Sequence, residues 1–333
     1  MNELGKNSGH AVAAGQVSMI QIDEECAGQR IDNFLIRICK GVPKSHVYRI
    51  LRSGEVRVNK GRVGADYRLE VGDLVRVPPV RVAAPELEAP AWMPAPSYSI
   101  VHEDDYVLVI DKPAGLAVHG GSGVSFGVIE QLRNARPKAK FLELVHRLDR
   151  ETSGLLMIAK RRSALVALHE QIRENRIDKR YLACVVGDWH DARRAVKAPL
   201  HKYLTPEGER RVRVQDDGLA SHTIFNLIER FENYAVLECE LKTGRTHQIR
   251  VHLQHLGTPI VGDEKYGDFA LNRRLSRSGV RPGIKRMFLH AYKLRFTHPG
   301  SGESVELQAP LPADCRQFID QLREDEGNVA KTI

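Results

Sequence analysis

The sequence lacks the patterns that mark disulfide-bonded, zinc-binding and membrane-spanning proteins. Its five cysteines form no C-x-x-C pair and are odd in number, which argues against both a disulfide framework and a zinc cage. No stretch approaches the roughly 18 consecutive apolar residues of a transmembrane helix. Near the N-terminus, AVAAGQVSMI is short and interrupted by polar residues, unlike a secretory signal. We therefore expect a cytoplasmic protein with reduced cysteines, no bound metal and no membrane contact.

Internal repeats and nucleotide-binding motifs are also missing. No segment recurs with a fixed period, so the chain is not a repeat protein. The glycine-rich stretch HGGSG, residues 119–123, is not followed by the G-K-[ST] of a triphosphate-binding loop. The composition instead indicates a globular protein that binds a polyanion, because 42% of the residues are hydrophobic and the formal net charge is +8. Ribosomal RNA, tRNA, DNA and acidic lipid all fit this charge.

Two short amphipathic helices are predicted near the N-terminus. In residues 31–38 apolar side chains recur at intervals of three and four, which places them on one helix face. Residues 47–51 repeat this pattern between Pro43 and Gly54, which favour the start and the end of a helix. The stretches VRVNKGRV and LEVGDLVRVPP then each combine a strand with a turn. We expect residues 21–80 to form a domain of two helices and a small sheet.

This N-terminal region carries most of the excess positive charge. Between Gln29 and Arg81 we count 12 lysines and arginines against 5 aspartates and glutamates, a net charge of +7. Such clustering favours a surface that contacts a phosphate backbone, with an ordinary solvated surface as the alternative. The cations that we expect to make these contacts are Lys44, Arg49, Arg52, Arg57 and Lys60.

A proline-rich stretch separates this domain from the rest of the chain. Six of the 16 prolines fall within residues 78–97, interleaved with alanine and without apolar periodicity. Such a composition predicts a semi-rigid, extended tether, so we expect the domains on either side to move relative to each other. The predicted organisation is a disordered N-terminus (1–20), a basic domain (21–80), a linker (81–97), a larger domain (98–325) and a tail (326–333).

Strands dominate the predicted larger domain. Three helices are expected, at residues 163–174, at residues 246–256 and around residues 315–322. Pairs of strands follow one another without a helix between them, which favours an α+β domain with a mixed, mostly antiparallel sheet. The segments rich in β-branched and aromatic residues that we expect to form strands are 107–111, 154–160, 179–187, 222–231, 234–242, 287–296 and 304–310.

One stretch, VHRLDRETSGLLMIAK at residues 145–160, places ionisable side chains directly before a buried strand. An ionised Asp149 beside apolar residues must be paired, because an unpaired carboxylate there would take up a proton. Arg147 and Arg150 are too close along the chain to turn toward it, and the best partner is Arg250 on the helix after TGR. Such a carboxylate suits nucleophilic or general-base chemistry. The alternative is a purely structural ion pair.

Several motifs resemble known RNA-modifying proteins. RIDNFL and PKSHVYRILRSGEVRVNKGRV resemble the S4-type RNA-binding domain. HRLDRETSGLL fits the pattern R-L-D-x-x-T-S-G-L of the RluA family of RNA pseudouridine synthases. Four more elements of that family occur in the family's order between residues 112 and 299: KPAGLAVH, KRYLACVVG, LKTGRTHQIRVHLQHLGTPIVGDEKYG and FLHAYKLRFTHP.

The resemblance implies a reaction and a set of active-site residues. The family converts uridine within RNA into its C-glycoside isomer without a metal, nucleotide or redox cofactor. Asp149 matches the carboxylate nucleophile, which attacks either the uracil ring or the ribose C1′. Tyr181 matches a tyrosine that can remove the C5 proton, Arg250 matches the partner of the aspartate, and Arg147 matches the residue that replaces the flipped base. The supporting residues expected from the motifs are His119, Thr152, Arg245 and His247.

The resemblance also implies a partner. The S4-like domain, HGGSGVSFGVIE and FLELVHRLD make the chain most similar to the members that modify large-subunit ribosomal RNA. We therefore expect a monomer without a cofactor that acts on 23S ribosomal RNA or on a pre-ribosomal particle. Residues 268–286 hold six lysines and arginines and little apolar periodicity, which favours a mobile loop that closes on RNA, or a solvent-exposed segment.

Other functions stay open at this point. The chain could act on another structured RNA, or be a ribosome-assembly factor that binds RNA without catalysis. A zinc-dependent base deaminase would need H-x-E and P-C-x-x-C motifs, which this sequence lacks. A glycoside hydrolase would need a second positioned carboxylate, for which Glu151 is the only near candidate.

Overall fold

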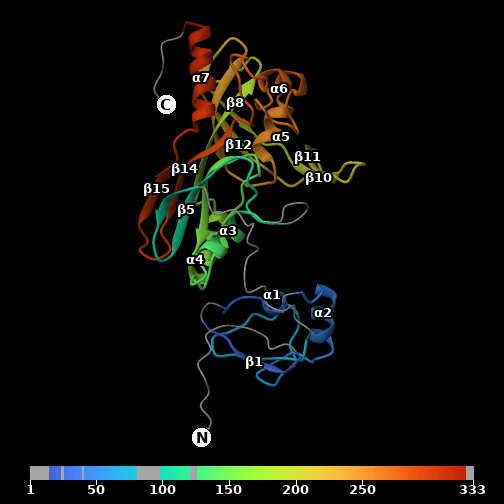
Figure 1. Ribbon diagram of the computed structural model, residues 1–333. Coiled ribbons are helices and arrows are strands. Elements are labelled where there is room, and N and C mark those ends of the chain that lie inside the picture. Colours follow the sequence, from blue (N-terminus) through green and yellow to red (C-terminus); the bar gives the residue numbers. More distant parts are fainter. Residues whose placement is uncertain (1–14, 24–25, 40, 81–97, 121–125, 328–333) are drawn as a thin grey trace. The chain divides into compact units, whose positions relative to one another are not determined.

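The computed structural model describes residues 15–23, 26–39, 41–80, 98–120 and 126–327 (Figure 1). The chain separates into two compact units, residues 1–93 and residues 94–333. This division falls inside the stretch predicted as a linker, residues 81–97, which itself lies outside the described residues, as do residues 1–14 and 328–333. All five cysteines are buried and none forms a disulfide, as predicted.

The N-terminal unit contains the two predicted helices and a three-stranded sheet in the order β1-β3-β2. The apolar stripes of both helices are buried, with Phe34 and Val47 fully enclosed. The prediction that residues 1–20 are disordered is wrong for residues 18–20, which belong to a strand that pairs with β3. The elements are β1 (Ser18–Gln21), α1 (Ile31–Ile38), α2 (Lys44–Arg52), β2 (Arg57–Val58) and β3 (Leu74–Val77).

The predicted turn in VRVNKGRV is a tight one that presents a lysine. The Val58 N–H donates to the Gly61 carbonyl over 3.0 Å, and the Gly61 N–H donates back over 2.8 Å. Between them, Asn59 and Lys60 have positive φ angles of 48° and 70°, the geometry of a type I′ turn.

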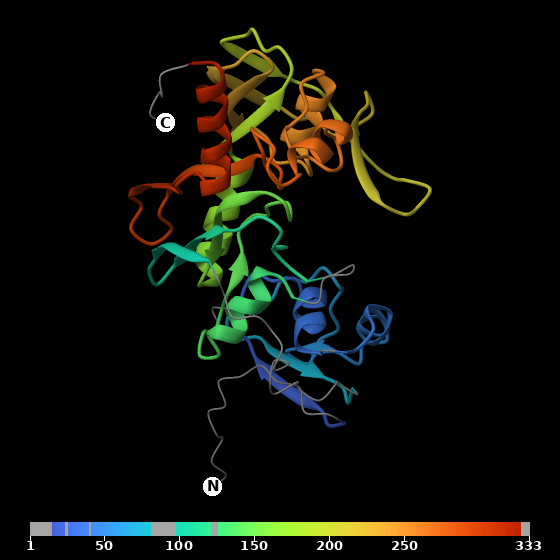
Figure 2. The same ribbon diagram turned by 45° about the horizontal axis from the view of Figure 1, so that its top comes forward.

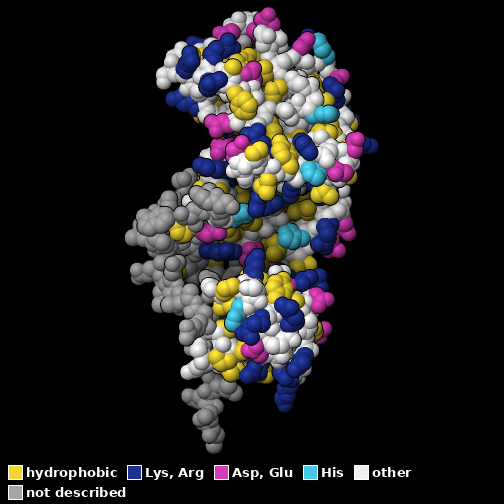
Figure 3. Space-filling model, turned by 90° about the vertical axis from the view of Figure 1, so that its right-hand side faces the viewer, with side chains coloured by type: hydrophobic (Ala, Val, Ile, Leu, Met, Phe, Trp, Pro, Cys, Tyr) yellow, Lys and Arg dark blue, Asp and Glu magenta, His cyan; other side chains and the backbone are white. Residues whose placement is uncertain are grey.

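The expected phosphate-contacting cations are mostly exposed on this unit. Lys44, Arg49, Arg52 and Lys60 are exposed, whereas Arg57 is half-buried. Arg49 is partly neutralised by Glu55, at 3.1 Å. Several Lys and Arg side chains are visible on this unit's surface in Figure 3. The N-terminal unit therefore presents free positive charge on its second helix and on the turn after β2.

The C-terminal unit is built on a ten-stranded sheet whose main path runs β4-β5-β7-β14-β8-β13-β12-β9. Among the described strands, β7 and β14 form the one parallel pair, so the predicted mostly antiparallel α+β fold is confirmed. β15 pairs with β14, and β6 pairs with β7. The strands are β4 (Ser99–Glu103), β5 (Val107–Lys112), β6 (Glu143–Leu144), β7 (Ser153–Ala159), β8 (Asp178–Val186), β9 (Arg193–Val196), β12 (Thr223–Arg230), β13 (Tyr234–Leu241), β14 (Leu289–Thr297) and β15 (Ser304–Gln308).

The central strands are covered by helices on both faces. In β5, Leu108 and Ile110 pack into a core with residues of α3, α5 and α7. Val107 and Val109 face the opposite way, into a second core with residues of α4. This double burial explains the uninterrupted apolar runs of β5 and β7. The helices are α3 (Val128–Ala135), α4 (Arg162–Arg173), α5 (Gln248–His255), α6 (Phe269–Leu275) and α7 (Ala313–Asp325).

The sequence did not predict helices α3 and α6, strands β4, β6 and β9, or a hairpin of two further strands. Residues 268–286, expected to form a loop, contain helix α6, because the Asp268 side chain accepts hydrogen bonds from the Ala270 and Leu271 N–H groups, both at 2.9 Å. A separate hairpin of β10 (Leu200–Leu204) and β11 (Arg210–Val214) was not predicted. This hairpin stands out from the main sheet (Figure 1, Figure 2).

Gly154 allows the close approach of β7 and β14. Its φ angle is +110°, and an added Cβ would lie 2.3 Å from the carbonyl oxygen of Ala291, its partner in the parallel pair. Only glycine fits this position without displacing a strand. Because Asp149 lies five residues before Gly154, the same contact fixes where the Asp149 loop enters the sheet.

We predict that Gly154→Ala lowers the free energy of unfolding by roughly 2–5 kcal/mol, since backbone strain and a clash with Ala291 add together. Gly302→Ala is the matched control, because Gly302 has a φ angle of +76° and open space around it. The control measures only the cost of a left-handed backbone at a residue with a Cβ, about 1–2 kcal/mol of the free energy of unfolding. Urea unfolding of the full chain measures both variants, and equal losses would contradict the close-approach argument.

Candidate active site

A cleft of about 1430 Å³ opens in the C-terminal unit around Asp149. Asp149 is the one carboxylate among its described lining residues, and ten of the others are cationic. The cleft therefore combines strong positive potential with one negative group. The cationic lining residues are Arg147, Arg150, Arg173, Lys179, Lys202, Arg210, Arg211, Arg245, Arg250 and Lys265.

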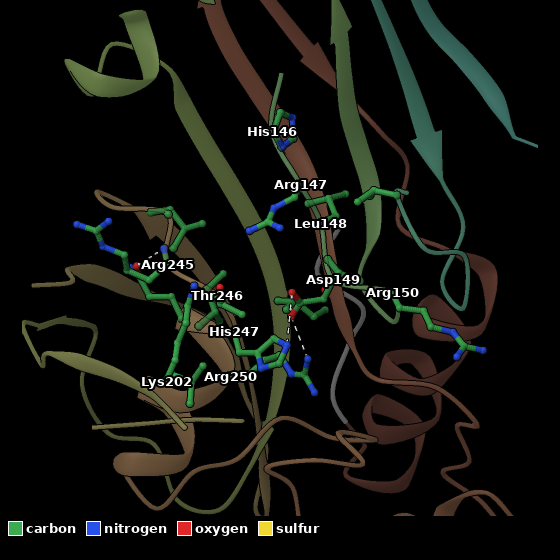
Figure 4. Close-up of a pocket in the computed structure, with 18 of the residues that line it drawn as sticks. His146, Arg147, Leu148, Asp149, Arg150, Lys202, Arg245, Thr246, His247 and Arg250 are labelled. Atoms are coloured by element: carbon green, nitrogen blue, oxygen red, sulfur yellow. Dashed lines mark hydrogen bonds and ion pairs between the residues drawn. The ribbon is translucent and has the colours of Figure 1, made fainter. Parts of the chain in front are cut away.

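Arg250, on helix α5, holds Asp149 as the sequence predicted. Its Nη1 donates to Asp149 Oδ2 over 2.9 Å (Figure 4). The same guanidinium binds Asp263 through two further bonds, Nε to Oδ2 at 2.7 Å and Nη2 to Oδ1 at 2.8 Å. Asp263 Oδ1 also accepts the backbone N–H groups of Lys265 and Tyr266. One arginine is thus shared between a fully satisfied aspartate and Asp149.

Burial and pairing set the charges of this cluster. Burial opposes the charge on Arg250, but its bonds to Asp263 and the charge of Asp149 outweigh that effect, so its pKa lies above the ordinary value. Burial would raise the pKa of Asp263, but the Arg250 guanidinium lowers it overall. At neutral pH the cation and the buried anion are therefore both charged. The Asp149 side chain stays 24% exposed, open to the cleft.

Tyr181 lies on β8 and lines the same cleft. It is buried, and its hydroxyl makes no hydrogen bond to another described residue. Burial, and then the negative charge of Asp149, raise its pKa above the ordinary value. The Tyr181 hydroxyl therefore keeps its proton at neutral pH, close enough to Asp149 to sense its charge.

The two arginines next to Asp149 in the sequence do not pair with it. Figure 4 shows the side chains of Arg147 and Arg150 extending to opposite sides of Asp149. Arg147 is exposed along the cleft, whereas Arg150 donates from Nε to the Gly115 carbonyl over 3.0 Å. Arg147 is therefore available to a ligand in the cleft.

A buried lysine binds the backbone of the loop that carries Asp149. Lys112, at the end of β5, is fully enclosed and donates to the carbonyls of Pro113 and Leu116, each at 2.8 Å, and of Arg150, at 3.1 Å. Burial lowers its pKa to about 7. The Gly115 N–H donates to the same Arg150 carbonyl over 2.9 Å. The KPAGL motif thus ties its own loop to the residue after Asp149.

The other predicted supporting residues also line the cleft. The His247 ring places Nε2 3.9 Å from Asp149 Oδ1. The Thr152 N–H donates to the Asp149 carbonyl over 3.2 Å. Arg245 donates to the Ala220 carbonyl, and His119 contacts the Gly120 carbonyl. The structure thus brings these four residues together with Asp149, Tyr181 and Arg250.

Asp263 and Tyr266 were not predicted as site residues. Both lie in GDEKYG, at the end of a longer family motif, and this position was the one sign in the sequence that they could belong to the site.

In the described part of the chain, no group of three or more His, Cys, Asp or Glu side chains is arranged to hold a metal ion. Within the same residues, no helix combines the length and apolar character needed to cross a bilayer.

Known proteins resemble this chain along nearly its whole length. The RNA pseudouridylate synthase model matches residues 106–255, and the S4 domain model matches residues 29–75. Ribosomal large subunit pseudouridine synthase C of Escherichia coli (strain K12) is 53% identical over 311 residues, covering 92% of this chain and 97% of that protein. The protein of the same name from Pasteurella multocida (strain Pm70) is 51% identical over 317 residues, covering 94% and 96%.

A solved structure shares the fold of the C-terminal unit. Human RNA Pseudouridylate Synthase Domain Containing 4 is 26% identical and superposes with a TM-score of 0.55, covering 68% of this chain and 93% of that one. With about half of its residues identical to bacterial synthases over almost their full length, this chain belongs to the RNA pseudouridylate synthase family and carries an S4 domain ahead of the synthase domain.

Proposed function

We propose that this protein converts specific uridines of large-subunit ribosomal RNA into pseudouridine, with Asp149 as the nucleophile. The observation that carries the proposal is the partly exposed Asp149 carboxylate, held by Arg250, which is one of ten cationic residues that line the cleft. The RNA target follows from the names of the relatives that share about half of its residues. The same geometry would serve another structured RNA, whereas a factor that only binds RNA would not need this carboxylate.

Binding must first remove the target base from its stack. Flipping costs a few kcal/mol, which the cationic cleft offsets through contacts with the phosphate backbone. Arg147, exposed along the cleft, takes the place of the flipped base, because its planar guanidinium stacks well between neighbouring bases. In the N-terminal domain, Lys44, Arg49, Arg52, Arg57 and Lys60 add contacts to the RNA backbone.

Asp149 then supplies the attacking oxygen. Oδ2 is engaged by Arg250, which leaves Oδ1 to attack either the ribose C1′ or the uracil ring. The bond between N1 and C1′ breaks, the uracil turns in the cleft, C5 bonds to C1′, and the Asp149 oxygen leaves the carbon that it attacked, which restores the free carboxylate. The C5 proton then leaves and N1 gains a proton, so that atoms and charge balance.

Tyr181 is the proposed base for the C5 proton. In the free enzyme its hydroxyl is protonated, in part because Asp149 is negatively charged. While Asp149 is covalently bonded, that charge is gone, and one cause of the raised pKa of Tyr181 disappears, whereas burial remains. At that stage the Tyr181 hydroxyl gives up its proton more readily, to N1 of the detached uracil, and the resulting tyrosinate can accept the C5 proton.

We predict that Asp149→Asn lowers the isomerisation rate by more than about 10³-fold, because an amide cannot act as the nucleophile. Binding of RNA should change little, since shape is preserved. Tritium release from ribosomal RNA labelled at uridine C5 measures the rate, and filter binding measures the affinity. Asp105→Asn, an exposed aspartate of the same unit, is the control. A rate within about tenfold of the wild type would rule out the nucleophile role.

The N-terminal cations generate a second prediction. Each cation that contacts a phosphate contributes about 0.7–0.9 to the slope of log affinity against log salt concentration. Replacing Lys44, Arg52 and Lys60 with glutamine should therefore make this slope less steep by roughly 2–3. Titrations at several salt concentrations measure the slope. The control replaces Arg193, Arg230 and Arg316, exposed cations of the other unit that do not line the cleft. Equal slopes for the triple variant and the wild type would refute an RNA-contacting surface on this domain.

A further inference from the structure

Tyr266 connects two walls of the cleft through one hydroxyl group. It follows Asp263 by three residues and is buried. Its oxygen lies 3.0 Å from the backbone nitrogen of Val212, on hairpin strand β11, and 2.8 Å from Nδ1 of His247. The Arg250 guanidinium lies over the Tyr266 ring, with its Cζ atom 5.1 Å from the ring centroid. None of the catalytic steps of Asp149 and Tyr181 uses this residue.

The two hydrogen bonds of Tyr266 determine where its proton goes. The Val212 N–H can only donate, so the tyrosine oxygen accepts that bond. The hydroxyl proton is then left for His247 Nδ1, the one acceptor that the described residues place within hydrogen-bond distance. Burial raises the pKa of Tyr266 to about 12, so this proton is present at neutral pH. His247 Nδ1 must therefore be unprotonated, and a neutral ring carries its proton on Nε2.

Charged groups from several elements face the His247 ring. Burial lowers its pKa; Asp149, on the loop before β7, and Asp263 raise it, while Arg250 and Lys265 lower it, and the net shift is downward. The ring is therefore neutral at neutral pH, and Tyr266 is its hydrogen-bonded neighbour at Nδ1.

The backbone of His247 is also unusual. At the N-terminal boundary of helix α5 it has φ 54° and ψ 21°, a left-handed conformation that is unfavourable for any residue with a Cβ. Such strain persists where the surroundings impose it, and it is concentrated at functional sites. The conformation points the ring into the cleft, with Nε2 3.9 Å from Asp149 Oδ1.

We propose that Tyr266 is a positioning residue that fixes His247 as the tautomer protonated at Nε2, so that His247 offers an N–H donor to an acceptor oxygen of the flipped nucleotide. His247 Nε2 lies 3.9 Å from Asp149 Oδ1, which is too far for a hydrogen bond between the two side chains. Asp149 Oδ1 and the His247 N–H thus both stay available to the same ligand. The identity of that ligand rests on the proposed function, whereas the tautomer is a property of the free protein.

The first experiment examines the free, full-length protein. With nitrogen-15-labelled histidine, two-bond proton–nitrogen correlation spectra distinguish the two imidazole tautomers, and His247→Gln identifies the His247 signals by their loss. We expect an unprotonated Nδ1 and a protonated Nε2 throughout the neutral pH range. A protonated Nδ1 would overturn the proposal. No RNA is needed, so this result does not depend on the proposed function.

The second experiment is a double-mutant cycle under single-turnover conditions with a 23S ribosomal RNA transcript. Tyr266→Phe keeps the ring and removes the hydroxyl, and should slow the reaction about tenfold, the effect of one hydrogen bond. His247→Leu removes the donor and should slow it about a hundredfold. Because Tyr266 acts through His247, the double variant should be no slower than His247→Leu.

The control for the cycle is Tyr98→Phe, which removes a hydroxyl that donates to the Val128 carbonyl elsewhere in the unit. Affinity for RNA should stay within about twofold in all variants, because the lost contacts act on the reacting nucleotide. If the two rate reductions multiply in the double variant, Tyr266 does not act through His247 and the proposal is overturned. A Tyr266→Phe rate equal to that of Tyr98→Phe would also overturn it. A wild-type protein that forms no pseudouridine would refute the proposed function, and the imidazole spectrum would still decide the tautomer.

Discussion

The active site depends on one guanidinium shared unequally between two carboxylates. A buried arginine is costly to desolvate, and Asp263 compensates for that cost with two short, parallel hydrogen bonds. Asp263 is itself satisfied by two backbone N–H groups, so it has no capacity left for other chemistry. The third nitrogen of the guanidinium, Nη1, donates to a single oxygen of Asp149. Asp149 is thereby held in place while one of its oxygens stays open to the cleft.

The fold brings this cluster together from distant parts of the chain. Asp149 precedes β7, Tyr181 lies on β8, and Arg250 lies on α5. Strand β14 pairs with both β7 and β8, so the loop with Asp149 and the strand with Tyr181 are fixed to one rigid support. Lys112 adds a connection from β5 through the Arg150 carbonyl. The site is therefore built on buried, central strands of the sheet.

Much of this could be predicted because burial leaves a pattern in the sequence. The apolar runs of β5 and β7 indicated strands, and the need to pair a carboxylate beside them indicated Arg250. Asp263 was missed, since a sequence does not show how many donors of an arginine remain free. The hairpin β10–β11, with HKYL and RRVRV, was missed because its charged residues hide the alternation of a strand. Helix α6 was missed because its start depends on a side-chain cap at Asp268 rather than on apolar periodicity.

The ten cations around the cleft have a consequence for the end of the catalytic cycle. Isomerisation leaves the number of phosphates, the overall size and the charge of the polynucleotide unchanged. Electrostatic attraction therefore retains the modified strand as firmly as the unmodified one, and it supplies no driving force for dissociation. Departure must therefore come from refolding of the RNA or from contacts that the modified strand makes with other groups, so that the fate of the product, rather than the cleft, sets the pace of release.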